Sequence, residues 1–193
     1  MKHTAVKALA VGLVASVLLS LGHFSALCGE IRGEVVRLHV LAHSDSEEDQ
    51  ALKLKVRDAV LMAAEGLLDG VVDQETALAV ATEQLPTLQA AAQRCVEENG
   101  YAYPVAVELC EMYFTTRTYD TGTLPAGWYN ALRVTIGSGE GRNWWCVVFP
   151  PICLGGATSM SDVVGEEAGE VVENAPRYQV RFKLVEWLEE LFG

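Results

Sequence analysis

Hydrophobic and polar residues alternate between residues 34 and 42, with a period of two that is typical of a β-strand. One face of this predicted strand carries three aliphatic side chains: Val36, Leu38 and Val40. From residue 46 the pattern changes to that of a helix, which is predicted to run to about residue 68. Ser46 is expected to cap this helix, because the acidic residues that follow it suit the positive end of a helix dipole.

The helix predicted over residues 46–68 has apolar residues on two opposite sides. Six of them share one face at about 100° per residue: Leu52, Val56, Ala59, Val60, Ala63 and Leu67. Three leucines spaced by seven lie on the other face: Leu54, Leu61 and Leu68. We therefore expect a sheet to cover one side and a second helix to cover the other, with an exposed groove for a partner as the alternative.

Shorter patterns predict the remaining elements of the domain. A second helix is predicted over residues 73–99, with a kink or a division at Pro86. Residues 105–114 alternate as a strand, and two β-rich runs within residues 131–149 flank a glycine-rich turn that predicts a hairpin. Together these elements make residues 29–154 one α+β domain with a mixed or antiparallel sheet and two long helices.

The C-terminal part of the chain has a different composition. Residues 155–176 are rich in glycine, serine and acidic residues and contain no basic residue, which predicts a flexible acidic linker. Residues 177–193 predict a C-terminal amphipathic helix. Its apolar face is expected to pack on the domain through five residues: Val180, Leu184, Trp187, Leu188 and Leu191.

Residues 1–28 are typical of a signal peptide or an N-terminal membrane segment. Lys2 and Lys7 flank the start of an uncharged run over residues 8–27, which is close to the length of a membrane span. Two pairs of small residues suit a signal peptidase: Ser20 with Gly22, and Ala26 with Cys28. We favour a cleaved or partly retained signal over a permanent anchor, and we expect the rest of the chain to be exported.

The charge of the exported part restricts its partners. Removing residues 1–28 takes away two of the 14 basic residues and none of the 26 acidic ones, which leaves a net charge of −14. Nucleic acids, anionic lipid head groups and cell-wall polyanions are poor partners for such a surface, because they are negatively charged as well. We therefore expect no nucleic-acid ligand, and contact with a membrane only through the N-terminal segment if it is not cleaved.

The chain has five cysteines, of which Cys28 belongs to the leader. The other four allow three disulfide pairings: Cys95, Cys110, Cys146 and Cys153. Cys146 and Cys153 flank a Pro-Pro bend, so a local bridge between them is predicted, with two buried thiols as the alternative. A second bridge would use Cys95 and Cys110.

His39 and His43 are the two histidines outside the leader, and with Asp45 they make a formal metal-ligand set. In a strand both rings would point to the same side, but Arg37 on that side would repel a cation. The sequence has no H-E-x-x-H motif and no third histidine downstream. We therefore expect no metal or other cofactor, and histidines that form hydrogen bonds or contact a partner.

No other motif predicts catalysis. The tripeptide DTG at residues 120–122 occurs in aspartic proteases, but it has no second copy here and its neighbours predict a surface turn. A G-x-S-x-G motif is absent as well, so the chain is not expected to be an enzyme. Trp144 and Trp145 must face opposite sides of a strand, so one is expected in the core and the other covered by the terminal helix or exposed for binding.

Three stretches of this sequence resemble a known family: RLHVLAHSDSEEDQALKLKVRDAVL, YFTTRTY with LPAGWYNALRVTIGSGEGRNWWCVVFPPIC, and VRFKLVEWLEELF. They are similar to the stage II sporulation protein R family of endospore-forming bacteria, from Arg32 to Cys153 and again from Val180. The resemblance implies a secreted signal that is made in the forespore and exported into the space between forespore and mother cell. There it would activate a membrane-embedded aspartic peptidase, which processes the precursor of the sigma-E factor.

The resemblance implies that this chain has a protein partner and no small-molecule substrate. Six residues are predicted to contact the membrane-embedded peptidase: His39, His43, Ser44, Asp45, Asp49 and Trp144. His43 departs from the family, which typically has asparagine there, and asparagine is a poor ligand for soft metals. The alternative function is a metal-dependent extracytoplasmic hydrolase that acts on the cell wall through His39, His43 and Asp45.

Overall fold

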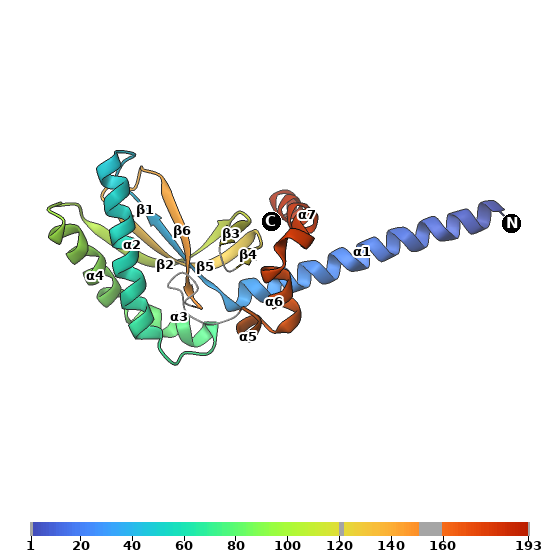
Figure 1. Ribbon diagram of the computed structural model, residues 1–193, viewed down its shortest axis with the longest axis horizontal. Helices are drawn as coiled ribbons and strands as arrows, with labels where there is room; N and C mark the ends of the chain where they lie inside the picture. The colour runs from blue at the N-terminus through green and yellow to red at the C-terminus, as the bar shows by residue number, and fades with distance from the viewer. Residues whose placement is uncertain (1, 120–121, 151–159, 193) are drawn as a thin grey trace.

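The computed structural model describes residues 2–119, 122–150 and 160–192. Four strands form the central sheet in the order β2-β5-β1-β6: β1 (Val36–Leu41), β2 (Val105–Phe114), β5 (Gly127–Ile136) and β6 (Asn143–Phe149). β1 is parallel to β5 and antiparallel to β6, and β2 is antiparallel to β5. The sheet is therefore mixed, and the predicted α+β fold is confirmed (Figure 1). A small hairpin follows β2 along the chain: β3 (Arg117–Tyr119) and β4 (Gly122–Leu124).

β1 lies between β5 and β6, so the hairpin predicted within residues 131–149 is wrong. Every residue of β1 from 36 to 40 is buried, and a strand that is buried on both faces belongs in the middle of a sheet. Leu38 is aligned with Leu132 on one side and with Cys146 on the other. Residues 137–142 consequently pass over the end of β1 instead of joining two paired strands. We call residues 137–142 the crossover loop.

Two helices cover one face of the sheet: α2 (Glu47–Leu68) and α4 (Leu85–Glu98). α2 begins as predicted, because the Asp49 N–H donates a hydrogen bond to Ser46 Oγ at 3.2 Å. α2 packs on β1 and β6 on one side and on α4 on the other, which confirms the predicted double cover (Figure 1). The second predicted helix is divided just before Pro86, into α3 (Gln74–Glu83) and α4.

The opposite face of the sheet is covered by both ends of the chain: α1 (Lys2–Glu34), α5 (Met160–Val164), α6 (Glu166–Glu173) and α7 (Ala175–Phe192). α5 and α6 lie in residues 155–176, where a flexible linker was expected. The difference arises because the apolar residues of α6 have helical spacing, so Ala168, Val171 and Val172 are buried while the glutamates face outward. The acidic composition of this segment concealed that spacing.

The exposure of α1 changes along its length. Its N-terminal part projects away from the domain, and an apolar window of 18 residues within it has no buried residue (Figure 1). The length and composition of this helix suit a membrane span, and a signal sequence has the same properties. Its C-terminal part enters the core, where Phe24, Leu27 and Cys28 are buried. The leader boundary expected at residue 28 therefore falls inside a core helix.

α7 packs on the domain through a face that the sequence pattern did not select. Phe182 and Val185 are each 3% exposed and belong to the core cluster on this side of the sheet. The expected face is turned outward, with exposed fractions from 40% at Leu184 to 74% at Val180, and the side chain of Leu188 is not among those described. The predicted packing face is therefore wrong. α7 has apolar residues on two sides, and the shorter row meets α1 and α6.

Candidate functional site

The corner between β1 and α2, residues 43–50, is held together by its own hydrogen bonds. Ser44 Oγ donates to the Asp49 carboxylate at 2.5 Å and accepts from the Ser46 N–H at 3.2 Å. The side-chain amide of Gln50 donates to the Ser44 carbonyl at 2.9 Å. Asp49 is buried. Ser44 and Asp49, both predicted as partner contacts, therefore serve first to hold the turn around Ser46, the residue that caps α2.

His43 attaches this corner to the crossover loop. The Ser138 N–H donates to His43 Nδ1 at 3.0 Å, and the imidazole stacks on Tyr103 with 4.2 Å between ring centroids. A side chain at Gly137 would collide with the His43 ring, and the φ angle of this glycine is 59°. The close approach and the left-handed backbone both require glycine at this position.

Asp45 and Lys53 hold the other end of the crossover loop. The Asp45 carboxylate accepts a hydrogen bond from the Arg142 N–H at 2.7 Å. The buried ammonium of Lys53 donates to the Arg142 carbonyl at 2.8 Å. Burial lowers the pKa of Lys53, and the nearby positive charge of Arg142 lowers it further. The crossover loop is therefore fixed at both ends by side chains from the corner and from α2.

His39 is a buried residue of β1, and its side chain does not reach the surface of the corner. It is 5% exposed, and its ring stacks on Trp145 with 4.2 Å between centroids. Neither ring nitrogen has a hydrogen-bond partner among the described residues. Burial, with a smaller contribution from the positive charge of Arg133, lowers the pKa of His39 to about 4. The ring is therefore neutral at pH 7 and packs as an aromatic side chain.

The metal set considered from the sequence is not assembled. His39 stacks on Trp145, whereas His43 and Asp45 each bond to the crossover loop. Within residues 2–119, 122–150 and 160–192, no three His, Cys, Asp or Glu side chains lie close enough to hold a metal ion. The three residues named for the hydrolase alternative are therefore not brought together as a metal site in this part of the chain.

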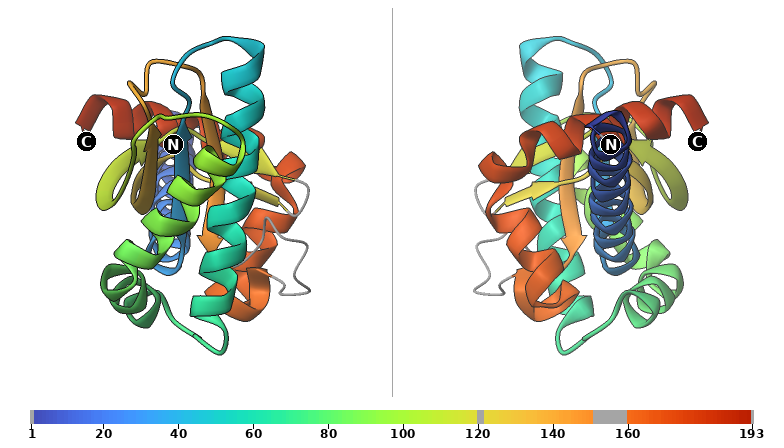
Figure 2. Two further views of the ribbon diagram at one scale, coloured as in Figure 1. Left: turned by 90° about the vertical axis from the view of Figure 1, so that its left-hand side faces the viewer. Right: turned by 90° about the vertical axis from the view of Figure 1, so that its right-hand side faces the viewer.

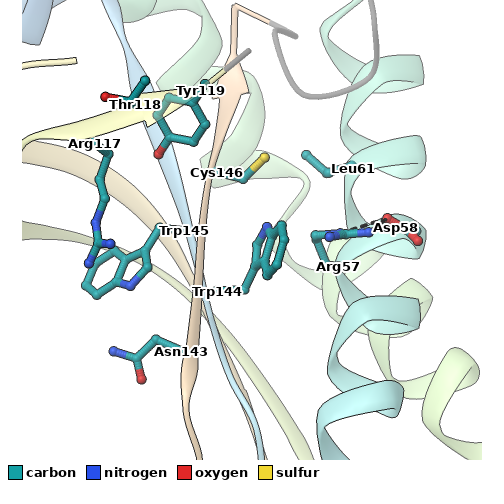
Figure 3. Close-up of a pocket in the computed structure, with 10 residues that line it drawn as sticks. All are labelled: Arg57, Asp58, Leu61, Arg117, Thr118, Tyr119, Asn143, Trp144, Trp145 and Cys146. Carbon is teal, nitrogen blue, oxygen red and sulfur yellow. Dashed lines mark hydrogen bonds and ion pairs between the residues drawn. The ribbon is translucent and has the colours of Figure 1, made fainter. Parts of the chain in front are cut away.

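Trp144, the sixth predicted contact residue, lines a groove of about 520 Å³ beside β6 (Figure 3). β6 is an edge strand of the sheet, and the groove lies along it between α2 and β3. We call this the β6 groove, and it is lined from three segments: residues 57–61 of α2, residues 117–119 of β3 and residues 143–146 of β6. It brings together residues that are more than 80 positions apart in the sequence.

Each side of the β6 groove pairs a tryptophan with an arginine. On the α2 side, the Arg57 guanidinium lies 4.5 Å from the centroid of the Trp144 ring and forms an ion pair with Asp58 at 2.7 Å. On the β3 side, the Arg117 guanidinium lies 5.4 Å from the Trp145 ring. Figure 3 shows the two tryptophans on opposite sides of β6. Trp144 is exposed and Trp145 is half-buried against the core, as the alternation of a strand predicts.

A buried arginine behind the groove was not identified from the sequence. The Arg37 guanidinium is 4.3 Å from the Phe114 ring and 4.9 Å from the Tyr129 ring. It donates to the Tyr119 hydroxyl at 2.6 Å and to the Cys146 carbonyl at 3.3 Å. Burial raises the pKa of Tyr119, although Arg37 counters this, so the phenol stays protonated at pH 7. Arg37 thus ties the β3 side of the groove to β6.

The cysteine predictions have two outcomes. Cys95 and Cys110 are free thiols, so the bridge suggested between them is wrong. Cys146 is buried on the α2 face of β6. Cys153 lies outside the described residues, and the bridge between Cys146 and Cys153 stays a prediction.

A model of the stage II sporulation protein R family matches residues 32–159. The matched part contains the central sheet, α2 to α4 and every residue that lines the β6 groove. The chain belongs to this family. The Stage II sporulation protein R of Bacillus subtilis (strain 168) is 32% identical over an alignment of 189 residues, and the alignment covers 84% of each chain. No solved structure matches the chain. Membership in the stage II sporulation protein R family gives the protein a role in sporulation.

Proposed function

We propose that this protein is an exported sporulation signal that activates a membrane-embedded aspartic peptidase, which then processes the precursor of the sigma-E factor. The observation that carries the proposal is membership in the stage II sporulation protein R family. The N-terminus supports export, since Lys2 and Lys7 flank the start of an apolar stretch of α1 that is not buried in the domain. The domain would act between forespore and mother cell as a protein ligand without enzymatic activity.

The β6 groove is the surface that we assign to the peptidase. It presents exposed Trp144 together with the guanidinium groups of Arg57 and Arg117, although the whole chain has a net charge of −12. Tryptophan and arginine around a concave surface are typical of the centre of a protein interface. The other predicted contacts at the corner would act indirectly. Ser44 and Asp49 shape the start of α2, which carries Arg57, whereas His43 and Asp45 hold the crossover loop, which leads into Trp144 on β6.

Co-expression of the full chain with the peptidase and its precursor substrate in a non-sporulating bacterium tests the proposal, with precursor cleavage as the readout. Wild-type protein should cause cleavage. Trp144→Ala should reduce the cleavage rate by about tenfold or more, because truncating a central interface tryptophan costs about 2 kcal/mol of binding free energy. Trp128→Ala is the matched control, because Trp128 is 49% exposed and lies outside the groove, and it should retain full cleavage.

Circular dichroism and thermal melting of each purified variant separate a lost contact from a lost fold. A folded Trp144→Ala protein that supports wild-type cleavage would remove the β6 groove from the proposal. If wild-type protein causes no cleavage at all, the proposed function itself is overturned.

A further inference from the structure

Twelve of the sixteen large exposed apolar side chains among the described residues lie on two helices. Eight of them lie on the projecting part of α1, between Val6 and Leu19. Four lie on α7: Val180, Leu184, Trp187 and Leu191. Single apolar residues on a surface are ordinary, whereas a continuous row of them marks a contact surface. We call these four residues of α7 the outer stripe.

The outer stripe has the composition of a helix that lies in a membrane interface. Its residues are spaced by four, three and four positions, so they occupy a narrow sector of the helix. Exposed basic side chains border it, with Lys183 on one edge and Arg177 and Arg181 on the other. Apolar rows flanked by Lys and Arg are typical of interfacial helices, and tryptophan, here Trp187, is enriched at that depth.

α7 is fixed crosswise against α1. Phe24 of α1 stacks on Tyr178 with 5.8 Å between ring centroids, and it meets Phe182 edge-on at 5.3 Å. Both views of Figure 2 look along α1 and show α7 running across it. A helix that crosses a membrane span at a large angle lies close to the plane of the membrane.

The position of α7 along α1 matches the end of a membrane span. Residues 3–19 of α1 are exposed. This stretch is about 26 Å long at about 1.5 Å per residue, and the hydrocarbon core of a bilayer is about 30 Å thick. Phe24, which holds α7, lies little more than one helical turn beyond the exposed stretch. α7 therefore crosses α1 at the level where lipid head groups would begin.

We propose that α7 lies in the head-group region of the bilayer that α1 crosses, with the outer stripe turned toward the acyl chains. The proposal rests on the attachment of α1 and not on the peptidase. At least part of α1 is expected to stay joined to the domain, because cleavage after Cys28 would remove Phe24, Leu27 and Cys28 from the core. Cleavage after Gly22 would leave the core intact and would detach the apolar span.

Outside α1, the acidic charge of the protein confines the membrane contact to α7. A net charge of −12 keeps most of the surface away from anionic head groups. Arg177, Arg181 and Lys183 are the exposed cations beside the outer stripe. Arg177 and Lys183 are ion-paired with Glu170 and Glu186 at 3.3 and 3.0 Å, and Arg181 lies over the Tyr178 ring, so each cation would have to share its charge with an anionic head group at the edge of the stripe. The membrane contact of the chain then extends beyond the N-terminal segment to which the sequence analysis limited it.

Tryptophan quenching by brominated lipid tests the proposal. The full-length chain is placed in vesicles of phosphatidylcholine and phosphatidylglycerol, whose brominated acyl chains quench tryptophan at the acyl boundary. Wild-type emission should be quenched, and Trp187→Phe should lose most of that quenching, because phenylalanine keeps an apolar ring but lacks the emission. Trp144→Phe in the β6 groove is the matched control and should keep the quenching. If Trp187→Phe is quenched as strongly as the wild type, the proposal is overturned.

A second variant tests the outer stripe itself. Leu184→Glu combined with Leu191→Glu changes two exposed positions, 40% and 53% exposed, so the melting temperature in detergent should stay the same. The variant should still sediment with vesicles through α1, but Trp187 should lose its quenching. Quenching that survives the two added charges contradicts the proposal. An unquenched wild type that forms a crosslinked dimer, abolished by the two glutamates, also contradicts it, since the stripe would then bind a second copy. None of these measurements involves the peptidase.

Discussion

The two faces of the central sheet are covered by different parts of the chain. α2 and α4 cover one face, and both helices come from the continuous segment between β1 and β2. The other face is covered by the end of α1 together with α5, α6 and α7, so it requires both ends of the chain. The cover of this first face therefore comes from one continuous segment of the chain. The second face depends on residues 24–31, which means that processing of the N-terminus and stability of the domain are coupled.

Truncation of the N-terminus should have the largest effect on the free energy of unfolding. It should act only through the cover of the second face. A chain that begins at His23 keeps the buried part of α1, whereas a chain that begins at Gly29 lacks Phe24, Leu27 and Cys28. Losing these side chains should cost on the order of 6–10 kcal/mol, which is comparable to the whole stability of a domain. Urea unfolding followed by circular dichroism should show a cooperative transition for the longer chain and none for the shorter one. Equal transitions would mean that the second face does not need α1.

Substitutions on the two sides of α7 should differ by several kcal/mol. Phe182→Ala removes a buried ring from the second face and should lower the free energy of unfolding by about 3–5 kcal/mol. Trp187→Ala on the outer stripe should change it in detergent by only about 0.5 kcal/mol. Leu52→Ala on α2 is the corresponding core substitution for the first face, and it should lower the free energy of unfolding by about 2–5 kcal/mol. Denaturant titration measures all three, and a larger loss for Trp187→Ala than for Phe182→Ala would reverse the assignment of the packed side.

A smaller effect than that of the core substitutions is a pH dependence of the free energy of unfolding, which arises at His39 on the second face. The pKa of His39 is about 4 in the folded protein, below the ordinary value of 6.5 that the unfolded chain should have. The unfolded state therefore binds the proton more tightly, so the stabilisation is complete above pH 6.5 and is lost as the pH falls toward 4. The loss should be on the order of 1–2 kcal/mol, because partial screening by water makes it smaller than the full shift implies.

His39→Asn provides the control for this titration, because asparagine has no titratable ring. The free energy of unfolding of the variant should be lower than that of the wild type at pH 7, where the stacking on Trp145 is lost, and it should fall less between pH 7 and pH 4.5. Parallel curves for the two proteins would assign the pH dependence to other groups. The expected loss of stability also makes His39 unsuitable as a probe of recognition.

The elements that the sequence predicted correctly are those whose determinants lie close together in the chain. Ser46 and Asp49 are three positions apart and start α2, and Pro86 divides the following helical segment by itself. The alternation of residues 105–114 has the same bounds as β2. In the candidate site, the outward position of Trp144 follows from the same period of two.

The features that the sequence did not predict depend on distant residues. Arg37 is buried because Phe114, Tyr119 and Tyr129, which come from three different strands, surround it. α7 has two apolar sides, and Phe24 at the other end of the chain decides which of them is covered. The β6 groove likewise exists only after α2, β3 and β6 have come together. Local periodicity shows that a face is apolar but carries no information about what will cover it.

The central place of β1 sets the order in which the chain can fold as it is made. Arg37 is aligned with Ala131 on one side and with Val147 on the other, so β1 has no neighbour until most of the chain has been synthesised. Contacts between strands so distant in sequence form slowly, and a parallel pair cannot form from a local turn. A chain that leaves a ribosome or enters a translocation channel N-terminus first therefore cannot pair β1 until β5 arrives, and the sheet is complete only with residues 143–149. The topology thus leaves β1 unpaired, and the sheet open, until most of the domain has emerged.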